Sequence, residues 1–330
     1  MAVPKRRRLG VALLVDSPVG IEIDGLRRGL GDPRLGAVPA HITLVPPLNV
    51  SSADLAQATA VLRAAASKVP GPITLTLGPP RSFLPDNPVV YLGVEGEPAA
   101  MRELRALREA VFVAPLHRKL SWPWVPHVTV LDTAEPEMIE SALGVLGGYR
   151  SQVSFERVVI LELGADRAWV PLTDVLLGPA ARVGTGGLAV ELSYSRLPDT
   201  ELAETLEREI PPAAAAPGGG ERPVWADRTA LRCGGDDLDI ATRSLLPPVF
   251  VTARREGSFA GAAWAWLDRS GPVVVVWVRP GLRRQGIGST LLAQLELRLR
   301  REGWQFARLS GFGPAGFFER RSGWSVPVER

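Results

Sequence analysis

The chain has 330 residues, of which 46% are apolar and 22% charged, with a net charge of +3. This length predicts two domains, and the composition is typical of a folded protein rather than a disordered one. No apolar run reaches the roughly 18 residues that cross a bilayer, so we expect no membrane partner. The nearly balanced charge does not indicate a strongly basic nucleic-acid-binding domain.

The compartment is inferred from the cysteine content and the N-terminus. Cys233 is the single cysteine, which excludes an intramolecular disulfide framework and a multi-cysteine zinc site. The basic run at 5–8 precedes only a short apolar stretch, without the cleavage pattern of a signal peptide. We therefore expect a cytoplasmic protein that begins with a strand and binds no metal.

Strands and helices alternate through the first half of the chain. Period-two patterns predict strands at 11–15, 41–45, 73–77, 89–94, 128–131 and 158–163. Amphipathic patterns predict helices that start at Ser51, Pro98 and Pro136. We expect Pro46-Pro47 to stop the strand that begins at His41.

The second half has its own set of predicted elements. Strands are expected at 188–195, 249–253, 259–267 and 273–278, and helices at 199–210 and 289–301. A Gly/Ala-rich stretch predicts a linker at 179–187, between domains at 1–178 and 188–330. The Pro/Ala/Gly-rich stretch at 211–220 is a competing boundary.

A four-residue pattern occurs twice in the first domain. His41-Ile-Thr-Leu and His127-Val-Thr-Val each lie on a predicted strand that is followed by a turn, a helix and another strand. Alternation along a strand places His41 and Thr43 on one face, and likewise His127 and Thr129. A duplicated lobe would bring both pairs to the walls of one cleft.

These residue types fit phosphodiester chemistry without a metal ion. One imidazole can take a proton from the attacking group while the other gives one to the leaving oxygen. The two hydroxyls can hold non-bridging oxygens of the phosphorus centre. The alternative is that each histidine only forms local hydrogen bonds at a strand end, which the repeated pattern argues against.

The two tetrads resemble the signature motifs of the 2H phosphoesterase superfamily, in particular the bacterial 2′-5′ RNA ligases, also called RNA 2′,3′-cyclic phosphodiesterases. The resemblance covers about residues 9–178. It implies a two-lobed, duplicated α+β fold and the opening of an RNA or nucleotide 2′,3′-cyclic phosphate to a 2′-phosphate. It also implies four catalytic residues, with the base and acid roles of the histidines left open: His41, Thr43, His127 and Thr129.

A glycine-rich turn joins the predicted strand at 273–278 to the predicted helix at 289–301. Glycines here let the backbone approach an anion, and the N–H groups of the helix start point toward it. The turn lacks the Gly-Lys-Ser/Thr of a P-loop and the three-glycine spacing of a dinucleotide-binding turn. The alternative is a tight structural turn without a ligand.

The turn resembles motif A of the GNAT acyltransferases, and the resemblance covers about residues 188–330. It implies that this part of the chain folds as a mixed-sheet α/β domain. It implies acetyl-CoA or another acyl-CoA as co-substrate or ligand, an unknown amine acceptor, and a pyrophosphate held by backbone amides of the turn. It implies that Trp277 and Val278 pair with the pantetheine arm. The expected cofactor-binding residues are Trp277, Val278, Arg283, Arg284, Gln285, Gly286, Ile287, Gly288 and Ser289.

The C-terminal part departs from the GNAT pattern. Phe317 or Phe318 stands where many members have a tyrosine that acts as general acid. Candidate general bases are Glu256, Asp268 and Glu319, and Cys233 has no neighbouring histidine to make it a nucleophile. Two hypotheses follow: a fusion of a cyclic phosphodiesterase with an N-acetyltransferase, or a phosphoesterase attached to a non-catalytic acyl-CoA sensor or scaffold.

Overall fold

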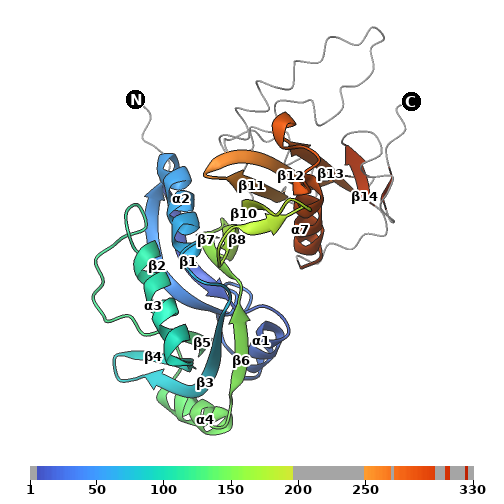
Figure 1. The fold of residues 1–330 in the computed structure, drawn as a ribbon. Helices are drawn as coiled ribbons and strands as arrows, with labels where there is room; N and C mark the ends of the chain where they lie inside the picture. Colours follow the sequence, from blue (N-terminus) through green and yellow to red (C-terminus); the bar gives the residue numbers. More distant parts are fainter. Residues whose placement is uncertain (1–5, 196–248, 269–270, 302–308, 313–323, 326–330) are drawn as a thin grey trace. The chain divides into compact units, whose positions relative to one another are not determined.

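The computed structural model describes residues 6–195, 249–268, 271–301, 309–312 and 324–325. The chain divides into two compact units, Met1–Pro179 and Ala180–Arg330 (Figure 1). Within the described residues, no helix is both long and apolar enough to span a membrane. The helix predicted at 199–210 lies outside the described residues.

The first sheet of the N-terminal unit is antiparallel, in the order β8-β7-β1-β2. Its strands are β1 (Arg6–Leu14), β2 (His41–Ser51), β7 (Arg157–Leu163) and β8 (Trp169–Leu176). Helix α2 (Leu55–Ala66) packs on β7 and β8 through buried residues that recur three or four positions apart. In this sheet β2 is an edge strand.

The second sheet is also antiparallel, in the order β5-β4-β3-β6. Its strands are β3 (Ile73–Phe83), β4 (Asn87–Glu95), β5 (His127–Leu131) and β6 (Ser151–Phe155). Helix α4 (Pro136–Leu146) packs on β3 and β4, and α1 (Val19–Gly29) contacts β5. Helix α3 (Pro98–Val111) contacts β2 and β3.

The two strands that carry the His-x-Thr tetrads are both edge strands, and they contact each other. His41 and His127 are the first residues of β2 and β5. Ile42, Leu44, Val128 and Val130 are fully buried, as the alternation predicts. The predicted two-lobed α+β fold is confirmed, with each tetrad at the meeting edge of its own sheet.

The prediction that Pro46-Pro47 would stop its strand was wrong. Strand β2 continues to Ser51, and its pairing with β1 shifts register between Leu9 and Val11, where the prolines lie opposite Gly10. An edge strand donates ladder hydrogen bonds to a neighbour on one side only, and at a bulge even those bonds are interrupted. Proline, which has no N–H to donate, is therefore tolerated at both positions. Helix α1 and strands β6 and β8 were not predicted, and α2 begins at Leu55, after the turn Ser52–Asp54.

The C-terminal unit holds a mixed sheet, as predicted. Strands β9 (Ala181–Val183), β10 (Leu188–Ser195), β11 (Val249–Arg255), β12 (Ser258–Asp268) and β13 (Gly271–Val278) pair antiparallel in sequence. Strands β14 (Leu309–Phe312) and β15 (Trp324–Ser325) continue it in parallel. Helix α7 (Ile287–Arg301) packs on β11, β12 and β13, and its fully buried leucines recur on one face: Leu291, Leu292, Leu295 and Leu299.

Two glycines of this unit lie in direct backbone contact. Gly184, in the turn between β9 and β10, has φ +65°, and Gly286, just before α7, has φ +87°. A Cβ on Gly184 would lie 2.1 Å from the carbonyl oxygen of Gln285. A Cβ on Gly286 would lie 2.6 Å from the Cα of Gly184. The β9–β10 turn therefore packs directly on the loop that leads into α7.

We expect Gly184→Ala to destabilise the C-terminal unit more than Gly187→Ala. Both positions have positive φ, which costs an alanine about 1–2 kcal/mol, but Gly187 has open space where a Cβ would stand. Because both variants carry the dihedral strain, the difference between their stabilities reports the close backbone contact at Gly184. Thermal unfolding of the full chain measures both, and equal losses of melting temperature would contradict the backbone contact.

Candidate functional site

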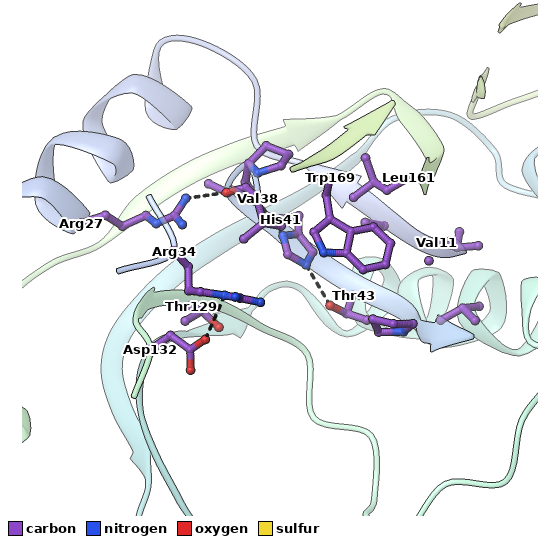
Figure 2. Close-up of a pocket in the computed structure, with 16 residues that line it drawn as sticks. Val11, Arg27, Arg34, Val38, His41, Thr43, Thr129, Asp132, Leu161 and Trp169 are labelled. Carbon is purple, nitrogen blue, oxygen red and sulfur yellow. Dashed lines mark hydrogen bonds and ion pairs between the residues drawn. The ribbon is translucent and has the colours of Figure 1, made fainter. Parts of the chain in front are cut away.

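A cavity of about 200 Å³ lies in the N-terminal unit. It is lined by residues of α1, β1, β2, β5, β7 and β8, of the segment between α1 and β2, and by Asp132 just after β5. His41, Thr43 and Thr129 are among them, so residues of both tetrads face one space (Figure 2). His127 lies outside this lining. The structure thus brings three of the four predicted catalytic residues to one cavity.

The imidazole of His41 is held by two hydrogen bonds. Its Nδ1 donates to the carbonyl oxygen of Pro39 at 2.7 Å, and its Nε2 lies 3.0 Å from the hydroxyl of Thr43 (Figure 2). In the neutral ring, Nε2 is then the basic nitrogen and accepts from Thr43. Burial lowers the pKa of His41 to about 4, with further lowering by the charges of His127 and Arg27, while the bond to Pro39 opposes this.

His127 repeats the same local arrangement on β5. Its Nδ1 donates to the carbonyl oxygen of Val125 at 2.8 Å, two residues upstream as in the other tetrad. Its ring lies edge-on to Phe83 and Tyr91, with ring centroids 5.0 and 5.3 Å away. Burial lowers the pKa of His127, and the bond to Val125 opposes it. Both histidines therefore keep Nε2 as the nitrogen that can exchange a proton.

A buried ion pair ties the two lobes together beside this cavity. Arg27, 3% exposed, donates from Nε to Asp32 Oδ2 at 2.7 Å and from Nη1 to the carbonyl oxygen of Val38 at 2.8 Å. Asp32 Oδ1 in turn accepts from the backbone N–H of Asp132, at the end of β5, at 3.2 Å. Arg34, 51% exposed, pairs with Asp132 at 3.5 Å at the cavity wall (Figure 2).

Sequence reasoning missed four of the residues that line this cavity: Arg27, Arg34, Asp132 and Trp169. Trp169 packs on Ala12, Val159 and Leu161, so it forms an apolar wall. Asp132 lies three residues after Thr129, and this closeness to the second tetrad is the sequence feature that could have indicated its place in the cavity. The others come from segments without a motif.

The glycine-rich turn singled out in the sequence lies directly before α7. Arg283, Arg284, Gln285 and Ser289 are exposed there, and Arg284 has φ +62°. Thr290 N–H donates to the carbonyl oxygen of Gly286, which leaves the N–H groups of Ile287, Gly288 and Ser289 without an intrahelical partner by helix geometry. Exposed arginines and these N–H groups can hold a diphosphate.

The end of β13 has partners of its own. Trp277 stacks on Phe259, with ring centroids 5.6 Å apart, and Arg283 Nε donates to the carbonyl oxygen of Val278 at 3.0 Å. Glu256 is exposed in the turn between β11 and β12, where it pairs with Arg255 at 3.6 Å. The remaining acyl-transfer candidates, namely Cys233, Phe317, Phe318, Glu319 and the side chain of Asp268, lie outside the described part of the chain.

Among the described residues, no group of three His, Cys, Asp or Glu side chains is arranged to hold a metal ion.

Several curated Bacillus proteins are similar to part of this chain. A "Putative phosphoesterase" of Bacillus pumilus is 34% identical over 115 residues, which is 35% of this chain and 64% of that protein. "Putative phosphoesterase Bcer98_0945" of Bacillus cytotoxicus is 33% identical over 123 residues, 37% of this chain and 68% of that protein. The chain thus spans slightly less than two thirds of the first relative.

Solved structures also resemble the chain. E. coli LigT complexed with 3′-AMP aligns with 20% identity and a TM-score of 0.40, covering 52% of this chain and 99% of that one. TT0787 of Thermus thermophilus aligns with 19% identity and a TM-score of 0.35, covering 52% of this chain and 97% of that one.

Two family models match separate parts of the sequence. The model of the 2′-5′ RNA ligase superfamily matches residues 15–167, which include both tetrads. The model of the acetyltransferase (GNAT) family matches residues 223–323, which include the turn before α7. The chain belongs to the 2′-5′ RNA ligase superfamily through its N-terminal unit, and its residues 223–323 are similar to the acetyltransferase (GNAT) family.

Proposed function

We propose that the N-terminal unit hydrolyses 2′,3′-cyclic phosphates at RNA ends or on nucleotides, without a metal ion. The observation that carries this proposal is the common cavity of His41, Thr43 and Thr129, with both histidines held in the same tautomer. The match to the 2′-5′ RNA ligase superfamily supports the same chemistry. We propose a cytoplasmic setting, since the single cysteine forms no disulfide within the chain.

The proposed reaction needs one proton acceptor and one proton donor. Water attacks phosphorus and loses a proton to Nε2 of one histidine; the bond from phosphorus to O3′ breaks, and O3′ takes a proton from Nε2–H of the other. Thr43 and Thr129 donate hydrogen bonds to the non-bridging oxygens, where negative charge develops. Because burial lowers both imidazole pKa values, an anionic phosphate in the cavity is what raises them toward neutrality.

The turn before α7 supports a second proposed function. We propose that the C-terminal unit binds acyl-CoA, with its diphosphate at the N–H groups of Ile287, Gly288 and Ser289 and beside the exposed Arg284. The acyl group would be transferred to an amine acceptor if a general acid and base complete the site. The rival proposal is an acyl-CoA sensor without turnover, and the absence of tyrosine at Phe317 and Phe318 favours it.

We expect His41→Ala and His127→Ala each to lower kcat for a 2′,3′-cyclic nucleotide by about 10²–10⁴-fold, since each removes a proton-transfer group. Thr43→Ala and Thr129→Ala should cost less, and Thr74→Ala, an exposed threonine of β3, serves as their control. EDTA should leave the rate unchanged. Activity lost to EDTA, or retained in the double histidine variant, would refute the mechanism.

The same histidine variants can assign the acid and the base. A substrate with sulfur in place of the 3′-bridging oxygen has a leaving group that needs no proton. It should restore activity to the variant that lacks the acid and not to the variant that lacks the base.

We expect His41 to stay neutral down to about pH 4 in the free protein, as NMR of its imidazole nitrogens would measure. The unfolded chain takes up this proton near pH 6.5, so the folded state should lose stability as pH falls from about 6.5 to about 4. His41→Gln should remove that part of the pH dependence. A midpoint near 6.5 in the folded protein would contradict the burial of this ring.

We expect acetyl-CoA to bind the full chain and to raise the melting temperature of its C-terminal unit. Gly288→Glu should abolish binding, because it places bulk and negative charge at the start of α7, and Arg283→Ala should weaken it less. Hydrolysis of cyclic phosphates should be unchanged in both. Calorimetry with no acetyl-CoA binding to the wild-type chain would refute both versions of this proposal.

Phe317→Tyr and Phe318→Tyr decide between transfer and sensing, with acetylated amine measured by mass spectrometry. A rise in transfer with either variant indicates an impaired enzyme, whereas binding without transfer supports the sensor.

A further inference from the structure

The connection between α3 and β5, residues 112–126, has a chemistry that the proposed reaction does not use. It contains neither helix nor strand, and it leads directly into His127 (Figure 1). Its sequence includes exposed Arg118 and Lys119 and no Asp or Glu. We refer to residues 112–126 as the α3–β5 loop.

Hydrogen bonds attach this loop to strand β2 at two positions. Trp124 Nε1 donates to the carbonyl oxygen of Thr43 at 2.8 Å, and Arg118 Nη1 donates to that of Pro47 at 2.9 Å. Thr43 and Pro47 both line the candidate active-site cavity. The guanidinium of Arg108 lies over the ring of Phe112 at 4.1 Å and near that of Trp124 at 5.7 Å. The loop is therefore held at the margin of the cavity.

Between these attachments stands one aromatic side chain that the unit does not bury. Trp122 is 71% exposed, although a tryptophan has a large apolar surface to remove from water. Arg118 and Lys119, both exposed, precede it by four and three residues in the same loop. An aromatic ring and cations on one loop suit single-stranded nucleic acid, because every base has a face that can stack and a phosphate that follows it in the strand. A protein partner would need no such alternation of ring and cation.

We propose that the α3–β5 loop binds the single-stranded RNA that precedes the cyclic phosphate, with Trp122 stacked on a base and Lys119 near a backbone phosphate. This inference rests on the proposed phosphodiesterase and specifies its substrate as an RNA strand rather than a mononucleotide. A base-paired end would not fit, because its bases are already stacked within the duplex. Arg118 retains further N–H groups for a second phosphate.

The test compares a five-nucleotide RNA ending in a 2′,3′-cyclic phosphate with a 2′,3′-cyclic mononucleotide. Trp122→Ala should lower kcat/KM for the oligonucleotide by about 10-fold, from stacking worth roughly 1–3 kcal/mol, and leave that for the mononucleotide unchanged. Trp122→Phe should restore most of the loss. Val145→Ala, an equally exposed apolar side chain on α4, is the control and should change neither rate.

The cation is tested by salt dependence. Lys119→Ala should weaken binding of the oligonucleotide and reduce its dependence on salt, because one fewer counterion is released. Lys68→Ala, an exposed lysine just after α2, is the matched control and should leave both unchanged.

The possible failures are distinguishable. If Trp122→Ala lowers kcat/KM equally for both substrates, the loop has a structural role. If it lowers neither value, the exposed ring does not bind RNA and a protein partner becomes its candidate ligand. Either result overturns the inference. If the wild-type chain hydrolyses neither substrate, the proposed reaction fails. Fluorescence anisotropy of labelled RNA then still tests the loop, and equal binding by wild type and Trp122→Ala overturns it.

Discussion

The meeting of the edge strands β2 and β5 is the constraint on which the N-terminal unit depends. Two edge strands from different sheets have no shared ladder to fix their relative position. The buried pair of Arg27 and Asp32 supplies the missing link, because Asp32 also accepts from the backbone of Asp132 at the end of β5. A carboxylate that is fully buried needs such partners, since an uncompensated buried charge costs several kcal/mol. The same groups therefore link the segment that leads into β2 with the end of β5.

The properties of the two histidines follow from this arrangement. Each begins an edge strand, so the residue two positions upstream turns its carbonyl back toward the ring and accepts from Nδ1. That bond directs Nε2 away from the backbone and determines the tautomer. Burial then lowers both pKa values, most clearly for His41, which lies near the permanent charge of Arg27. The geometry thus yields two neutral imidazoles in the free protein, which an anionic ligand would perturb.

The two units offer anion sites of different construction. In the N-terminal unit the polar groups are side chains projected from strands, and their positions depend on how two sheets meet. In the C-terminal unit they are backbone N–H groups at the start of α7, where the direction of the helix alone orients them. The backbone contact between Gly184 and Gly286 packs the β9–β10 turn against the loop before α7. Glycine at 286 is thus required by the packing of this unit, independently of any ligand.

By itself, the sequence determined the elements whose signals are local. The repeated His-x-Thr tetrads predicted two lobes and three residues of the candidate cavity, His41, Thr43 and Thr129, because alternation along a strand is a local rule. Local patterns likewise predicted the strand at 273–278, the glycine-rich turn and the helix at 289–301 of the second unit.

Only the tertiary structure decided the rest. Arg27, Asp32 and Trp169 come from segments with no motif, and they approach the tetrads through packing of elements far apart in the chain. Pro46-Pro47 would end an interior strand, but here they sit at a bulge on an edge, which the sequence does not reveal. The low pKa of His41 depends on burial and on charges from α1 and β5, so it exists only in the folded unit. Residue types and local spacing are written in the sequence, whereas burial, partners and charge environment arise when distant segments meet.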